Sequence, residues 1–328
     1  MVPQLQRLKN QMTIAAVGNF CELTAKAIAL PCLGMAMFIL VWHIMASNIV
    51  TSLGQFPGPL AVWDQSNNLL SEHYSEREKA RHFYQRQEAR NAKTLAENRH
   101  AVVKIRPYTG QATYFAQILT SLYTVAIGFS LATIVAIPLG MVCGLSEKAY
   151  RAVNPIIQIF KPVSPLAWLP LVTMVVSATY VSSDPYFEKA FVTSAVTVAL
   201  CCLWPTVVNT TVGVAAIDDD LIHVSRVLRL STFVHIKAIV LPSALPMIFT
   251  GLRLSLATGW MVLIAAEMLA QNPGLGKFIW DEFQNGSSSS LARIMVAVIT
   301  IGIVGFILDR LMLAVQKYVS WDKQAILR

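Results

Sequence analysis

The sequence predicts an all-α integral membrane protein with six transmembrane helices. The 328 residues are 55% hydrophobic and only 13% charged, against roughly 25% charged residues in a soluble domain. The mean hydropathy is +0.54. Uncharged or nearly uncharged runs of about 20 residues recur along the chain, and this length crosses a bilayer as a helix. These observations exclude a typical soluble enzyme, a disulfide scaffold, a coiled coil and a disordered chain.

The charge pattern also favours a lipid bilayer as the surroundings of this chain. The formal net charge is +8, which in a soluble protein would suggest nucleic acid. Here the positive side chains gather at the ends of apolar runs, so the positive-inside rule explains them and no nucleic acid partner is expected. The five cysteines are odd in number and form no Cys-x-x-Cys pair, so we expect buried thiols and no metal site.

The first transmembrane helix is expected within 27–53, after an N-terminal segment 1–26. Its apolar run contains His43 as the one titratable residue and is too long for the hydrophobic part of a signal peptide. It is therefore interpreted as an uncleaved membrane anchor. The five later spans form a core expected over 114–316, followed by a C-terminal segment 317–328. Their apolar runs are 118–145, 166–181, 191–217, 247–270 and 294–315.

Residues 54–113 form a charged insert between the first two spans. Its part 64–106 holds nine Lys or Arg and six Asp or Glu. The stretch 75–100 contains neither proline nor glycine, and pairs such as Glu76 with Lys79 have helical spacing. We therefore predict a solvated helix. One interpretation is a charged surface helix, and the alternative is a docking or gating element.

Orientation follows from the lysine and arginine side chains of the short connections, because these are enriched on the cytoplasmic side. With six spans, the two termini and the connections after spans two and four fall on one side. These segments carry Arg7, Lys9, Lys26, Lys148, Arg151, Lys161, Arg226, Arg229, Lys237, Lys317, Lys323 and Arg328. We expect both termini in the cytoplasm and the insert outside it, since long loops cross largely regardless of charge.

The connection 219–242, between the fourth and fifth spans, carries the strongest functional signal. Three aspartates at 218–220 are typical of a helix N-terminus. An apolar face at helical spacing follows, formed by Leu221, Val224, Leu228 and Phe233. Pro242 and Pro246 close the segment. The pattern predicts a short amphipathic helix, a turn and a rigid return into the membrane.

This connection resembles the coupling loop of ABC importer permeases, whose pattern is Glu-Ala-Ala, three residues, Gly, nine residues, Ile-x-Leu-Pro. All spacings are kept, and the matching positions are His223, Val224, Ser225, Arg229, Ile239, Leu241 and Pro242. Arg226 and Leu228 lie between them. Arg229 stands where the pattern has glycine, which would avoid a cost of about 1 kcal/mol for a left-handed backbone. Either the turn does not need that conformation, or Arg229 contacts a partner through its charge.

Further resemblance, to the nitrate/sulfonate/taurine class of these permeases, covers nearly all of 56–315. It is carried by FPGPLAVW at 56–63, SLYTVAIGFSLATIVAIPLGMVCGLS at 121–146, KPVSPLAWLPL at 161–171 and LPSALPMIFTGLRLSLATGWMVLIAAEML at 241–269. Likeness to the nitrate type rests on VSRVLRLS at 224–231, on AAEMLAQNPGLGKFIWDEFQNGSSSSLARIMVAV at 265–298 and on the charged insert.

The resemblance implies the ABC type I importer permease fold in a bacterial inner membrane. It implies a permease homodimer, two cytoplasmic ATPase subunits that hold the coupling loop, and an extracytoplasmic binding protein that delivers nitrate or nitrite. The chain has no G-x-x-x-x-G-K-[ST] motif. We therefore expect a non-catalytic subunit that binds no cofactor, with ATP and Mg²⁺ on the partner ATPases.

Candidates for the translocation path are the polar side chains inside the apolar runs. Charged groups inside a membrane are costly and often functional. Arg253 could favour a passing anion, Glu267 is a carboxylate near the outer end of its span, and Asn209 and Thr210 offer hydrogen-bonding groups. The alternatives are a side chain that reaches the interface, or helix packing.

Two rival functions remain open from the sequence. One is the same type of permease for another small anion, such as bicarbonate, cyanate, taurine or another sulfonate. The other is an ion-coupled secondary transporter, which usually shows internal repeats and discontinuous helices around charges. We find no such repeat in the sequence.

Overall fold

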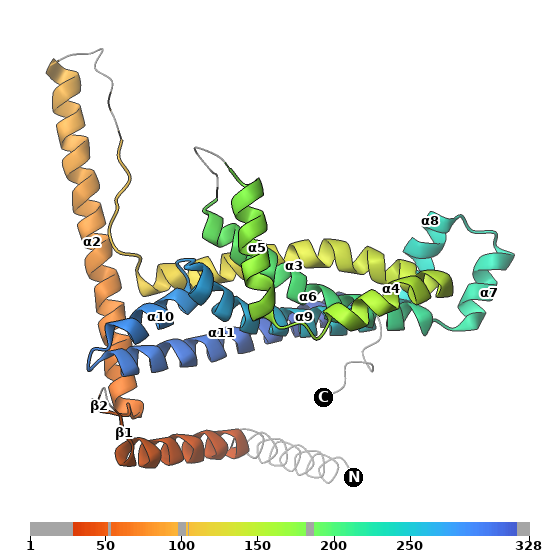
Figure 1. The fold of residues 1–328 in the computed structure, drawn as a ribbon, viewed down its shortest axis with the longest axis horizontal. Coiled ribbons are helices and arrows are strands. Elements are labelled where there is room, and N and C mark those ends of the chain that lie inside the picture. Colours follow the sequence, from red (N-terminus) through yellow and green to blue (C-terminus); the bar gives the residue numbers. More distant parts are fainter. Residues whose placement is uncertain (1–28, 52–53, 98–102, 104, 182–186, 320–328) are drawn as a thin grey trace, which may run out of the picture.

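The computed structural model describes residues 29–51, 54–97, 103, 105–181 and 187–319. Four long helices lie side by side and run along the long axis of the protein (Figure 1). They are α3 (Tyr114–Leu145), α6 (Lys189–Ala215), α9 (Leu241–Ala270) and α11 (Ser290–Val319). Helix α6 packs against both α3 and α9, and α11 packs against α9. These helices make up most of the expected core 114–316.

The count of membrane spans depends on one broken element. Within the described residues, five helical stretches are long and apolar enough to span: Ala29–Asn48, Tyr114–Leu145, Lys189–Ala215, Thr232–Ala270 and Ser290–Val319. The third predicted span, 166–181, corresponds to α5 (Pro165–Thr179), whose 15 residues reach only about 22 Å at the α-helical rise. It is bent by 100° from α4 (Glu147–Phe160), so the two helices form either a broken sixth span or a re-entrant loop. Pro162 and Pro165 explain the break, because each lacks an amide hydrogen and disfavours helix just before it.

The N-terminal helix, described over Ala29–Asn48, ends before residue 53, the predicted boundary. Ser47 and Asn48 end it, because their side chains donate hydrogen bonds of 2.8 and 2.7 Å to the carbonyl oxygen of Ile44. A short antiparallel hairpin follows, with β1 (Val50–Thr51) paired to β2 (Gly54–Gln55). The predicted segment 1–26 lies outside the described residues.

The insert forms the long helix α2 (Pro59–Glu97), which confirms the helix expected from its composition. It lies across the direction of the spans at one end of the bundle (Figure 1). The chain then runs back beside α2 as the return segment 105–113. Gln87 exchanges two hydrogen bonds with the backbone of Arg106, at 3.3 and 3.2 Å. The amide of Tyr108 donates to the Tyr84 hydroxyl at 3.1 Å.

Small residues allow close packing between the central helices, as in many membrane bundles. A Cβ atom on Gly140 of α3 would lie 2.6 Å from the Cβ of Thr210 on α6. A Cβ atom on Gly259 of α9 would lie 2.4 Å from the sulfur of Cys202 on α6. Larger side chains at these two positions would force α3 and α9 away from α6.

Candidate functional site

The coupling loop 219–242 forms the end of the bundle opposite α2 (Figure 1). It contains α7 (Asp219–Val227), α8 (Thr232–His235) and a π-helical turn (Ile236–Val240) that leads into α9. Asp218 caps α7, since its Oδ1 accepts a hydrogen bond of 2.9 Å from the amide of Asp220. This confirms the helix start expected from the three aspartates. The stretch Thr232–Ala270 is one continuous helical run of 39 residues.

Helix α7 ends in a turn closed by two backbone hydrogen bonds. The amide of Leu230 donates to the carbonyl of Ser225 at 3.2 Å, and the amide of Arg229 donates to the carbonyl of Arg226 at 3.1 Å. Arg229 has φ of 49°. This is the left-handed helix ending in which glycine is usual. Of the two explanations offered for Arg229, the first, that the turn does not need this conformation, is therefore wrong.

A buried serine joins the two helices of the coupling loop. Ser225 is 6% exposed, and its Oγ lies 2.8 Å from Nδ1 of His235 on α8. A small side chain is needed there, because the position faces α8. At the other end of the loop, Ile239 and Leu241 are half-buried and Val240 is buried. These apolar residues fix the loop to the bundle.

The outer surface of the coupling loop is apolar and flanked by arginines. Val227 is 81% exposed, Phe233 74% and Leu228 63%. The other exposed residues of the predicted set are His223, Val224, Arg226, Arg229 and Pro242. A group of exposed apolar side chains beside arginines is typical of a protein interface. The apolar face predicted for this loop thus points away from the protein's own core.

Of the four predicted path residues, the two on α6 take part in helix contacts. Thr210 is fully buried against Gly140 of α3, and its hydroxyl has no hydrogen-bond partner among the described residues. Asn209 donates from Nδ2 to the carbonyl oxygen of Pro205 at 2.8 Å. Its Cβ also lies close to Gly251 of α9. A role of either residue in the path stays a prediction.

Arg253 is paired with a carboxylate that the sequence analysis did not single out. Its Nε and Nη2 donate to one oxygen of Asp309 on α11 at 3.1 and 2.8 Å, and each side chain is 34% exposed. Pairing lowers the cost of charge in a membrane. It also offsets the field that Arg253 would present to an anion. The charged pair Asp309–Arg310 inside the apolar run 294–315 was the available sequence signal.

Glu267 is fully buried and joins three helices. Its carboxylate accepts hydrogen bonds from Oγ of Ser121 on α3 at 2.9 and 2.8 Å, and from the amide of Gly276 at 3.0 Å. Gly276 lies in the first turn of α10 (Leu275–Asn285), where a carboxylate is favourable. Asn272 donates to the same carboxylate at 3.5 Å. These contacts support an anchoring role, and a place of Glu267 in the path stays a prediction.

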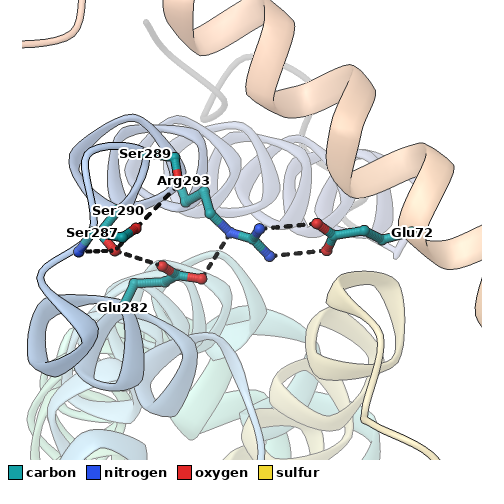
Figure 2. A network of polar contacts seen from close by, with 6 residues as sticks. All are labelled: Glu72, Glu282, Ser287, Ser289, Ser290 and Arg293. Carbon is teal, nitrogen blue, oxygen red and sulfur yellow. Dashed lines mark hydrogen bonds and ion pairs between the residues drawn. The ribbon is translucent and has the colours of Figure 1, made fainter.

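A second charged network lies where α2 meets α10 and α11 (Figure 2). Arg293 of α11 donates two parallel hydrogen bonds to Glu72 of α2, both at 2.9 Å. Its Nε lies 2.7 Å from Oε1 of Glu282 on α10. Ser290 donates to the other oxygen of Glu282 at 3.0 Å. Sequence spacing could not reveal this network, because Glu72 and Arg293 are 221 positions apart.

A cavity of about 790 Å³ lies between α2 and the outer ends of α3 and α10. Its lining includes Tyr114 and Gln117, whose hydroxyl and Oε1 are buried without a hydrogen-bond partner in the described part of the chain. Its charged lining includes Glu76, Lys277 and Asp281. Helix α2 is therefore not closely packed on the bundle along this part of its length.

A family model described as "Binding-protein-dependent transport system inner membrane component" matches residues 136–320. The nitrate import permease protein NrtB of Synechococcus elongatus is 39% identical over 204 residues, which cover 62% of this chain and 69% of the relative. NrtB of Leptolyngbya laminosa is 37% identical over 220 residues, covering 66% and 74%. The bicarbonate transport system permease protein CmpB of Synechococcus elongatus is 31% identical over 306 residues, covering 92% and 90%.

A solved structure shows the same fold at low sequence identity. It is an inward-facing conformation of the MetNI methionine ABC transporter, with a TM-score of 0.54 and 16% identity. The match covers 63% of this chain and 96% of that chain. The expected type I importer permease fold is therefore confirmed, with five membrane-spanning helices in the described residues, or six if α4 and α5 are counted as one bent span.

Proposed function

Because the chain belongs to the family of inner membrane permeases of binding-protein-dependent ABC transport systems, we propose that it forms the membrane pathway of an ATP-driven importer of nitrate or nitrite. Nitrate permeases from three organisms, 37 to 42% identical to this chain, support the substrate. The resemblance of 224–231 and 265–298 to nitrate-type permeases supports it independently.

The observation that carries the permease role is the exposed surface of the coupling loop. Its apolar side chains are left uncovered by the described residues, with Val227 81% exposed and Phe233 74% exposed. Arg226 and Arg229 lie beside them. Two cytoplasmic ATPase subunits, one for each permease of a homodimer, would cover this surface. ATP and Mg²⁺ belong to those subunits, and this chain performs no covalent chemistry.

The proposed mechanism uses the continuous helix Thr232–Ala270 as a lever. It links the coupling loop at one end to Glu267 and α10 at the other. When ATP draws the ATPases together, they move the two loops and rotate this helix. The permease pair then changes from inward-open to outward-open. In this topology both termini lie in the cytoplasm and α2 lies outside, where the binding protein delivers the anion.

Bicarbonate is the second candidate substrate. The bicarbonate permease of Synechococcus elongatus aligns over 92% of this chain, a wider match than the 62% for the nitrate permease of the same organism. The nitrate permease is more similar within the aligned part, at 39% identity against 31%. Both anions are small and planar, and recognition by the binding protein would separate them.

The substrate test measures ATPase activity of the complex in nanodiscs, co-expressed with its ATPases and supplied with its binding protein. Stimulation by nitrate, with no response to bicarbonate, supports the proposal. Stimulation by bicarbonate alone overturns the assignment of nitrate as the substrate and leaves the permease role supported. Failure of any ATPase to co-purify contradicts the proposed role of the coupling loop.

The coupling-loop test replaces Arg226 and Arg229 with glutamate. We expect the ATPases to be lost from the purified complex, or transport to be uncoupled from hydrolysis, because two positive charges beside the docking surface become negative. The matched control is Arg151→Glu on α4, an exposed arginine that is paired with Glu147 of its own helix. Unchanged co-purification and transport in the double variant would contradict the assignment.

A further inference from the structure

Helix α2 is attached to the rest of the protein over only part of its length. Its proximal half buries Val62 and Leu69, and His73 lies 2.9 Å from the hydroxyl of Thr113. Beyond Glu76, its hydrogen bonds and ring contacts with other described segments go to the return segment 105–113. A cavity of about 790 Å³ lies between residues 69–79 of α2 and helices α3 and α10. The position of α2 therefore depends on a few attachments in its first half.

The Arg293 network is the strongest polar attachment among them. The guanidinium is only 21% exposed and lies between Glu72, 53% exposed, and Glu282, 11% exposed. Two parallel hydrogen bonds to Glu72 fix distance and orientation together, which a lysine ammonium cannot do. Ser290 holds Glu282 in place from the other side (Figure 2).

This network continues through the bundle toward the coupling loop. Glu282 belongs to α10, and the first turn of α10 is bound to Glu267 through the Gly276 amide. Glu267 lies in the last turns of the continuous helix Thr232–Ala270, whose other end is α8 of the coupling loop. The hydrogen bonds from Arg293 to Glu72, the ion pair of Arg293 with Glu282, helix α10, the hydrogen bond from Gly276 to Glu267 and the helix Thr232–Ala270 thus join α2 to the coupling loop.

We propose that Arg293 is a positioning residue of the transport cycle. It holds α2 and α10 as one body at the outer face, so that a binding protein seated there acts on helix Thr232–Ala270 through Glu282 and α10. This inference rests on the proposed function and adds the route by which the outer face controls the ATPases. It does not require Arg293 to touch the anion.

The experiment is a double-variant cycle in the nanodisc complex with its binding protein. The variants are Glu72→Gln, Arg293→Lys and the two together, and basal and stimulated ATPase rates are measured for each. We expect each single variant to lower the ratio of stimulated to basal rate about fivefold, the lower end of typical coupling between sites. The basal rate stays near that of the wild type. The double variant should lower the ratio of stimulated to basal rate no further than Arg293→Lys alone does, because both changes break the same contact.

The control variant is Glu78→Gln on the same helix. Glu78 is 62% exposed and pairs with Arg81 and His82 of α2 itself, with no contact to the bundle among the described residues. It should leave the ratio unchanged. Glu72 is itself largely exposed, so Glu72→Gln tests the link without a folding defect.

The outcomes separate this inference from the function on which it rests. A wild-type complex that the binding protein does not stimulate overturns both. A stimulated wild type with unchanged ratios in both single variants overturns the inference alone. Additive losses in the double variant also overturn it, because Glu72 and Arg293 would then act separately. Equal loss of basal and stimulated rates would indicate a purely structural role.

Discussion

Replacing Gly274 with alanine tests whether the buried carboxylate of Glu267 holds the outer end of the bundle together. An ideal Cβ atom at Gly274 would lie 2.2 Å from Oε1, 2.3 Å from Cδ and 2.4 Å from Oε2 of Glu267. These separations are at least 1 Å shorter than ordinary van der Waals contacts, which begin near 3.4 Å. The carboxylate must therefore retreat from its place.

The cost follows from the hydrogen bonds that this movement breaks. The carboxylate accepts from Ser121 at 2.8 and 2.9 Å and from the Gly276 amide at 3.0 Å. A hydrogen bond contributes about 0.5–1.5 kcal/mol between neutral groups and about 1.5–3 kcal/mol to a charged group. Loss of the contacts from these two donors predicts a fall of about 1–6 kcal/mol in the free energy of unfolding.

The assay is unfolding of the purified protein by dodecyl sulfate in mixed micelles, followed by far-ultraviolet circular dichroism. Gly302→Ala is the matched control, because no atom lies within 4 Å of its ideal Cβ position. It should change stability by less than about 1 kcal/mol, the usual helix-propensity effect. In a protein that already carries Glu267→Ala, the change Gly274→Ala should cause no further loss of stability from this clash. A loss below 1 kcal/mol, or full additivity of the two changes, would refute the reasoning.

Two further predictions concern the coupling loop and helix α2, at the two ends of the helix bundle. Arg229→Gly should relieve the left-handed strain and slow hydrogen exchange of the Leu230 amide about fivefold, equivalent to roughly 1 kcal/mol; faster exchange would contradict this. The hydrogen bond from Lys79 lowers the pKa of Glu76, so the carboxylate that accepts from the Tyr108 hydroxyl stays charged at neutral pH. The charged Glu76 carboxylate therefore contributes stability at pH values above the ordinary pKa of glutamate, and this contribution is lost as the pH falls through the lowered pKa. Protection of the Tyr108 amide, relative to the exchange rate of an unprotected amide at the same pH, should fall in acid, and a Glu76→Gln variant whose protection has the same pH profile as the wild type would refute this.

Much of the fold could be predicted because its signals are local. Apolar runs, their bounding charges and the absence of helix breakers in 75–100 need only neighbouring residues to be recognised. The three aspartates at 218–220 likewise predicted the cap of α7 correctly. The third span was predicted less accurately, because the chain there forms two helices, α4 and α5, bent by 100° at a proline-containing break.

The candidate sites were predicted less completely because their partners are distant in sequence. The sequence indicated that Glu267 and Arg253 lie in apolar runs, yet Ser121 is 146 positions from Glu267 and Asp309 is 56 positions from Arg253. The Glu72–Arg293 pair was missed for the same reason. In both cases the structure adds the partners: Arg253 is ion-paired with Asp309, and Glu267 accepts hydrogen bonds from Ser121 and the Gly276 amide, while their place in the translocation path stays a prediction.

The sequence by itself determined the membrane class, the approximate spans, the helical insert and the position of the coupling loop. Each depends on hydropathy or spacing over a few tens of residues, which the chain carries wherever it folds. Only the tertiary structure decided which charges pair, which face of the coupling loop stays uncovered and that Arg229 adopts a left-handed backbone. These features arise from contacts between segments that meet only after folding, and such contacts leave no periodic pattern in the chain.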